Sequence, residues 1–200
     1  MSQGLFIVIE GIDGTGKSTQ SKRLADWFRS RGREVVLSRE PTDGPWGKKL
    51  RDSGTTGRLS AEEELECFLN DRHEHVEMSI KPALAEGKVV ILDRYYFSTM
   101  AYQGARGFDP AEIRLRNEAF APRPDLLLIL DLSVESAHGR IGARGDTTNE
   151  FEQRDTLSCC REIFLSLRDE PFACVIDAEP SLNVVTADIL SVVAAKFPDA

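Results

Sequence analysis

Leu5-Phe6-Ile7-Val8-Ile9-Glu10, continued at once by Gly11-Ile12-Asp13-Gly14-Thr15-Gly16-Lys17-Ser18, is the stretch that decides the fold of this 200-residue chain. The apolar run predicts a buried strand, and residues 11–18 match G-x-x-x-x-G-K-[ST], the P-loop pattern. Its glycines permit a tight turn whose N–H groups point at phosphate oxygens, aided by the dipole of the next helix. In such a loop Lys17 reaches the β- and γ-phosphates and Ser18 holds Mg²⁺. We therefore expect an ATP phosphate site formed by Gly11, Gly14, Thr15, Gly16, Lys17, Ser18 and Thr19.

The composition favours one domain and argues against several kinds of partner. With 41% hydrophobic residues and no low-complexity segment, the chain can bury one sizeable core, so we predict a single domain over 1–200. A net charge of −8 disfavours nucleic acid as a partner. No basic-then-apolar leader precedes the first strand, and no apolar run approaches the ~20 residues that span a bilayer. We expect a soluble cytoplasmic protein that binds no membrane.

Strand-like apolar runs alternate with longer amphipathic stretches along the chain. We predict strands over 5–10, 34–38, 88–92, 126–131 and 172–176. We predict helices over 17–31, 61–86, 95–104, 110–120, 133–143, 151–168 and 181–196. Consecutive apolar residues in the strands suggest burial on both faces. This alternation predicts an α/β fold: a five-stranded parallel sheet with helices on both faces.

Charged residues come directly after the predicted strands, at the sheet edge where ligands of such folds bind. Arg39 follows the second strand, and Asp93 and Arg94 follow the third. We expect all three near the phosphates, with Asp93 and Ser18 as Mg²⁺ ligands, because a carboxylate that ends a strand opposite a P-loop is typical of a metal site. The alternative is that Asp93 caps the next helix and Arg94 is a solvated surface residue.

Short segments spread over nearly the whole chain carry a resemblance to a known family. Besides the P-loop they are 39–41 (REP), 68–72 (FLNDR), 81–84 (KPAL), 93–95 (DRY) with Ser98 and Thr99, 101–104 (AYQG), 123–126 (RPDL) and 151–152 (FE). In this order and spacing they resemble the thymidylate kinase family. The resemblance implies a P-loop kinase fold with a short mobile lid at about 140–155. It further implies Mg²⁺-dependent transfer of the γ-phosphate of ATP to dTMP, giving dTDP and ADP for dTTP synthesis.

The resemblance also implies an acceptor site for dTMP. Its residues are Asp13, Arg39, Glu40, Pro41, Phe68, Arg72, Arg94, Ser98, Tyr102 and Gln103. In the family's pattern Asp13 would contact the 3′-hydroxyl, Arg39 and Glu40 would shape the phosphate site, Arg94 would bind the phosphate and Tyr102 would crowd the 2′ position.

For the base, the family's pattern would have Phe68 stack on thymine, Arg72 bond its carbonyl edge and Gln103 reach the ring. Phe68 and Arg72 are four residues apart, which puts them on one helix face, and stacking plus a planar donor is a physically reasonable way to read a base. Without the family pattern, Phe68 would be read as a core residue, and Tyr102 as ordinary packing.

The chemistry needs charge neutralisation and alignment more than a base. A nucleoside monophosphate has a second pKa near ~6, so its oxyanions are already nucleophilic at neutral pH. We therefore expect no catalytic histidine, and we predict that His73, His75 and His138 lie on helix surfaces. Lys17, Asp93 with Mg²⁺ and Arg94 would align and neutralise the two polyanions.

A further catalytic arginine is expected from the lid. Some family members carry an arginine inside the P-loop, where this chain has Gly14. Arg140 and Arg144 are therefore the lid candidates, and Arg154 stays open as a third. The alternative is a solvated loop without catalytic role.

Two alternative functions stay open at this point. The acceptor could be another nucleotide, such as deoxyuridine monophosphate, or a nucleoside, since base choice depends on few side chains. The chain could also be an ATP-binding regulatory module whose lid signals to a partner. The resemblance finally implies a homodimer built through the helices that flank the acceptor pocket.

Overall fold

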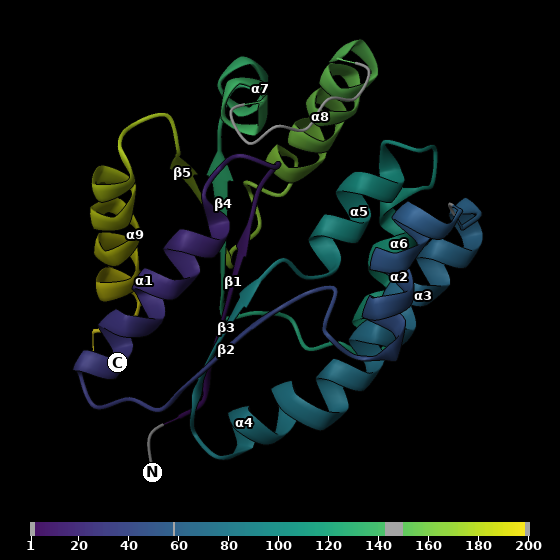
Figure 1. Ribbon diagram of the computed structural model, residues 1–200. Coiled ribbons are helices and arrows are strands. Elements are labelled where there is room, and N and C mark those ends of the chain that lie inside the picture. The colour runs from purple at the N-terminus through teal and green to yellow at the C-terminus, as the bar shows by residue number, and fades with distance from the viewer. Residues whose placement is uncertain (1–2, 58, 143–149, 199–200) are drawn as a thin grey trace.

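A computed structural model describes residues 3–57, 59–142 and 150–198, and a five-stranded parallel sheet forms its centre (Figure 1). The strand order is β2-β3-β1-β4-β5. In the central register Ile7 of β1 pairs with Ile91 of β3 on one side and with Leu126 of β4 on the other. The strands are β1 (Leu5–Glu10), β2 (Val35–Arg39), β3 (Val89–Asp93), β4 (Leu126–Asp131) and β5 (Ala173–Asp177). The predicted α/β fold is confirmed.

Helices cover both faces of this sheet (Figure 1). On one face lie α1 (Lys17–Ser30) and α9 (Leu182–Lys196). Toward the other face lie α2 (Pro45–Thr56), α3 (Ala61–His75), the π-helix η1 (Val76–Ile80), α4 (Lys81–Ala85), α5 (Tyr96–Gly104), α6 (Pro110–Glu118) and α8 (Glu150–Leu165). Helix α7 (Val134–Gly142) comes after β4. Among the described residues, none of the helices has the length and apolar character that a membrane crossing requires.

The start of α3 is set by a capping box, which fixes the helix that carries Phe68 and Arg72. Ser60 Oγ accepts from Glu63 N at 3.2 Å, and Glu63 returns the bond by accepting from Ser60 N at 3.0 Å. This arrangement satisfies two backbone donors at the helix end. The helix predicted over 61–86 is found as three consecutive segments, because η1 interrupts the α-helical hydrogen-bond pattern before Lys81.

Burial of the strands depends on their place in the sheet. The residues of β1 are all buried, as are the first four residues of β3 and the first five of β4. On the edge strands, Leu37 of β2 is 37% exposed and Val175 of β5 is 38% exposed. The expectation of burial on both faces is therefore wrong for the edges, because the flanking helices leave the margins of the sheet partly open.

Candidate active site

The P-loop joins the end of β1 to the start of α1, and its geometry requires glycine. Gly11 has a φ of +143°, and a Cβ there would lie 2.5 Å from the carbonyl oxygen of Leu130. Lys17 curls back over the loop, donating from Nζ to the carbonyl oxygens of Gly11 and Ile12 at 2.9 Å each. Burial, together with the nearby Arg94 guanidinium, lowers the pKa of Lys17 to about 8. The amine is thus charged at neutral pH and held against the loop.

A cavity of about 190 Å³ opens in front of this loop, and we call it the P-loop cavity. Ser18 Oγ donates to Asp93 Oδ2 at its rim. The other carboxylate oxygen, Asp93 Oδ1, is buried and has no hydrogen-bond partner among the described residues. An orphaned buried oxygen beside a hydroxyl suits a hard cation such as Mg²⁺. The cavity is lined by Asp13, Gly14, Gly16, Lys17, Ser18, Thr19, Asp93 and Arg94.

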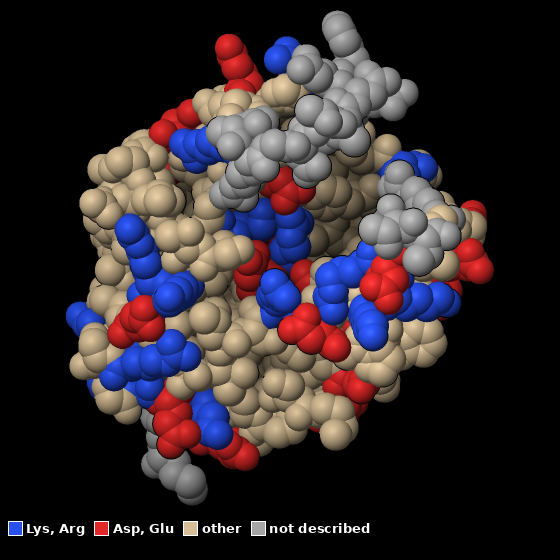
Figure 2. Space-filling view, in the orientation of Figure 1, with Lys and Arg blue, Asp and Glu red and all other residues tan. Residues whose placement is uncertain are grey.

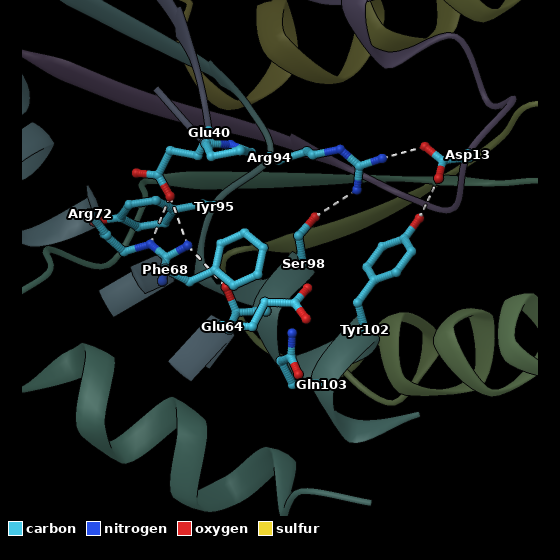
Figure 3. Close-up of a pocket in the computed structure, with 12 residues that line it drawn as sticks. Asp13, Glu40, Glu64, Phe68, Arg72, Arg94, Tyr95, Ser98, Tyr102 and Gln103 are labelled. Atoms are coloured by element: carbon cyan, nitrogen blue, oxygen red, sulfur yellow. Dashed lines mark hydrogen bonds and ion pairs between the residues drawn. The ribbon is translucent and has the colours of Figure 1, made fainter. Parts of the chain in front are cut away.

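A second cavity, of about 220 Å³, lies between α3 and α5, and we call it the aromatic cavity (Figure 3). Phe68 and Arg72 both line it, on the side away from Asp13 and Tyr102 (Figure 3). It is lined by Asp13, Glu40, Pro41, Glu64, Phe68, Arg72, Arg94, Tyr95, Ser98, Thr99, Tyr102 and Gln103. The structure thus brings together all of the predicted acceptor-site residues except Arg39.

Arg39 lies apart from the other predicted acceptor residues. Its side chain is 64% exposed and pairs with Asp43 at 3.2 Å. It lines a third cavity, of about 370 Å³, together with Ser18 and Asp93. Arg39 therefore neighbours the P-loop cavity, as its position at a strand end predicts, but not the aromatic cavity.

Asp13 and Arg94 line both the P-loop cavity and the aromatic cavity. Arg94 donates to Asp13 from Nη2 and to Ser98 Oγ from Nη1, the latter at 3.1 Å, and Tyr102 Oη donates to Asp13 Oδ2 at 3.1 Å (Figure 3). Although burial opposes it, the charges of Arg94 and Lys17 hold the pKa of Asp13 below its usual value. In Figure 2, Lys, Arg, Asp and Glu side chains gather around the central hollow of the molecule.

The backbone of Arg94 has a φ of 72°, in the left-handed region that non-glycine residues rarely adopt. Such conformations persist where the surroundings hold them, and they cluster at functional sites. Here the backbone N–H of Arg94 donates to the carbonyl oxygen of Ile9 at 3.1 Å. The loop after β3 is thus tied directly to the P-loop strand.

Comparison with known proteins shows the family of this chain. Residues 9–189 match the family model described as Thymidylate kinase. The chain belongs to the thymidylate kinase family. It is 53% identical over 196 residues to the thymidylate kinase of Xanthomonas euvesicatoria pv. vesicatoria, covering 98% of this chain and 86% of that protein. It is 51% identical over 197 residues to the thymidylate kinase of Akkermansia muciniphila, covering 98% and 95% of the two chains. The chain is thus a kinase, and the family's reaction is the phosphorylation of dTMP to dTDP with ATP.

In this kinase the described part of the predicted lid region, 140–155, places one predicted arginine beside the P-loop. Arg140 of α7 donates to the carbonyl oxygens of Gly14 at 3.4 Å, Ala178 at 3.2 Å and Glu179 at 3.3 Å. Arg144 lies outside the described residues, within 143–149. Arg154 of α8 is exposed. Which lid arginine acts in the kinase stays a prediction.

One histidine prediction is wrong, since His75 does not lie on the helix surface. It is buried at the end of α3, where its Nε2 lies 2.9 Å from Ser38 Oγ and its Nδ1 lies 3.0 Å from Glu40 Oε1. The physical reason is that this turn of α3 packs against the carboxyl end of β2. His73 is exposed, as predicted, and His138 is partly buried.

Glu10 is a site residue that sequence reasoning missed. Its carboxylate accepts from Tyr95 N at 2.7 Å, from Ser98 N at 3.0 Å and from Ser98 Oγ at 2.7 Å. Complete burial is the main reason why its pKa is raised to about 7. Glu10 thereby fastens the start of α5, and with it Arg94, to the strand that leads into the P-loop. The sequence did carry a signal for this role, because Glu10 is the one acidic residue in an otherwise apolar strand.

Proposed function

We propose that this kinase transfers the γ-phosphate of ATP to dTMP where the P-loop cavity and the aromatic cavity meet. The observation that carries the proposal is that Asp13 and Arg94 line both cavities. An in-line transfer needs the two phosphates to approach each other without water between them. A cleft that receives ATP phosphates from one side and a nucleotide from the other supplies that arrangement.

On the ATP side, P-loop N–H groups and Lys17 would bind the phosphates. Ser18 and Asp93 would hold Mg²⁺, supported by the buried oxygen Asp93 Oδ1, which has no hydrogen-bond partner among the described residues. The ion would neutralise charge on the phosphate oxygens. The described residues contain no cluster of three or more His, Cys, Asp or Glu suited to a metal. This agrees with a Mg²⁺ bound mainly through substrate phosphates and few side chains.

On the acceptor side, Phe68 would stack on the pyrimidine and Arg72 would donate to its carbonyl edge. Arg94 would bind the dTMP phosphate as a bidentate donor, exchanging its present contact with Asp13 for the ligand. Tyr102 would close the sugar site from α5. None of these side chains must remove a proton, because the phosphate of dTMP is mostly dianionic at neutral pH, with a second pKa near ~6.

The test is an acceptor panel in a coupled assay of ADP formation. We expect the highest kcat/KM with dTMP, a value about 10–200-fold lower with dUMP, which lacks only the methyl group, and none above background with thymidine. ADP formation at the same rate without any acceptor would contradict a kinase and favour the ATP-binding regulatory module. Higher kcat/KM with dCMP or a purine nucleotide would assign a different acceptor.

We further propose that the chain forms a homodimer through helices that flank the acceptor cavity. Two large apolar side chains on segments next to those helices support this: Met78 of η1, which continues α3, is 76% exposed, and Leu115 of α6, which contacts α5, is 74% exposed. Burial of such side chains commonly stabilises association. Sedimentation equilibrium at micromolar concentration tests the proposal, and a monomer mass there would contradict it.

A further inference from the structure

Arg72 lines the aromatic cavity, and protein acceptors hold almost all of the hydrogen-bond donors of its guanidinium. Glu40 Oε2 accepts from Nε at 2.8 Å and lies 2.7 Å from Nη2. Thr99 Oγ1 accepts from Nη2 at 3.1 Å. The side chain of Arg72 is 2% exposed, so these contacts are shielded from solvent. An arginine that is bound in this way has little freedom to turn.

The acceptor for Nη1 comes from Asn117, a residue of α6. Asn117 Oδ1 accepts from Arg72 Nη1 at 2.6 Å. The other end of the amide, Nδ2, donates to the carbonyl oxygen of Ile113 at 2.8 Å, one turn earlier in the same helix. Because Nδ2 is engaged with the helix, the oxygen must face the guanidinium. Asn117 is fully buried and does not line the cavity.

The donors of Arg72 leave one position for a ligand. With Nε and both Nη2 hydrogens engaged by Glu40 and Thr99, and one Nη1 hydrogen engaged by Asn117, the second Nη1 hydrogen has no acceptor among the described residues. Arg72 lines the aromatic cavity, and this donor is the one left for a ligand there. A ring carbonyl satisfies such a donor, whereas an amino group in the same place would set donor against donor.

We propose that Asn117 is a positioning residue for base selection, which acts through Arg72 and does not touch the substrate. By holding Nη1, Asn117 keeps the remaining donor of Arg72 aligned with the edge of the base. A pyrimidine with a carbonyl oxygen at that edge is accepted, and one with an amino group in the same position is rejected. This inference rests on the proposed function, in which Arg72 meets the edge of the base.

The test compares Asn117→Leu, which keeps the approximate size but lacks an acceptor, with Asn117→Asp, which keeps an oxygen toward Arg72. Initial rates are measured with dTMP, with dCMP and with varied ATP. In Asn117→Leu we expect KM for dTMP to rise about tenfold and the preference for dTMP over dCMP to shrink about tenfold, because a buried donor loses its partner and Arg72 its alignment. KM for ATP should stay within about twofold, and Asn117→Asp should keep dTMP kinetics within about threefold of wild type.

The opposite results would overturn the inference. One is a folded Asn117→Leu variant, shown by an unchanged circular dichroism spectrum, with wild-type KM and base preference. The other is an equal loss in Asn117→Leu and Asn117→Asp, which would assign Asn117 a structural role through Ile113. If Asn117→Leu does not fold, Asn117→Ala takes its place, with the same expected result and the same contradiction.

Arg72→Ala separates failure of this inference from failure of the proposed function. If Arg72→Ala raises KM for dTMP while Asn117→Leu does not, only the role of Asn117 is wrong. If Arg72→Ala also has wild-type kinetics with dTMP, then Arg72 does not meet the base, and the proposed acceptor site is wrong as well.

Discussion

Replacing Glu40 by glutamine should destabilise the protein strongly. Among the described residues, Glu40 has the only carboxylate that contacts two buried basic side chains, those of Arg72 and His75. Glu40 binds Arg72 through Nε and Nη2, and it binds His75 through Nδ1. The side chains of Glu40, Arg72 and His75 are 3%, 2% and 6% exposed. Glutamine keeps the shape but carries no charge, so the guanidinium would be left buried without its counter-ion.

The size of the effect comes from this burial. Removing one partner of a buried ion pair typically costs about 3–5 kcal/mol of unfolding free energy. For a chain of this length that corresponds to a melting temperature lower by about 6–20 °C. By contrast, Arg39 and Asp43 form an exposed pair, with side chains 64% and 78% exposed. Asp43→Asn should therefore change the unfolding free energy by at most about 1 kcal/mol.

The assay is urea denaturation of wild type, Glu40→Gln and Asp43→Asn at one protein concentration, since association would add to the apparent stability. The expected result is a clearly lower midpoint for Glu40→Gln with an unchanged slope. A loss of less than about 1 kcal/mol, no larger than for Asp43→Asn, would refute the idea that Glu40 neutralises Arg72.

Four further predictions concern activity. The pKa of Lys17 is lowered to about 8, so its charge is lost above that pH. We therefore expect kcat/KM for ATP to fall about tenfold per pH unit above about pH 8. A kcat/KM that stays constant up to about pH 10 would contradict this. Arg94→Ala should lower kcat by about 10²–10³-fold, whereas the matched control His73→Ala, at an exposed helix position, should keep wild-type kinetics; equal rates in both variants would remove Arg94 from the mechanism. Phe68→Ala should raise the Kd for dTMP by about 5–100-fold in calorimetry, from the about 1–3 kcal/mol of a stacked base, and an unchanged Kd would place the base elsewhere. Chelation by EDTA should abolish turnover and added Mg²⁺ should restore it, with Asp93→Asn needing more Mg²⁺ than wild type; activity that persists in EDTA would exclude the metal site.

The parts of the fold that the sequence predicted are those set by local pattern. Continuous apolar runs identified the strands to within a residue or so, and the P-loop motif identified the turn between β1 and α1. The spacing of Phe68 and Arg72 predicted one helix face, and both side chains line one cavity. Periodicity and motif spacing sufficed for these features because they depend on neighbours in the chain.

The parts that the sequence did not predict depend on contacts between distant elements. His75 is buried because β2 happens to offer Ser38 and Glu40 opposite the last turn of α3. Asn117 meets Arg72 across 45 positions of sequence, and nothing near it in the chain indicates that partner. The position of Arg39 outside the aromatic cavity likewise depends on tertiary packing.

A crystal structure with dTMP and a non-hydrolysable ATP analogue would test the central claim most directly. The account predicts the pyrimidine beside Phe68 with a carbonyl oxygen on Arg72, the dTMP phosphate on Arg94, and the analogue's phosphates on the P-loop next to Lys17. A dTMP molecule bound in the third cavity with Arg39, or anywhere outside the aromatic cavity, would contradict it.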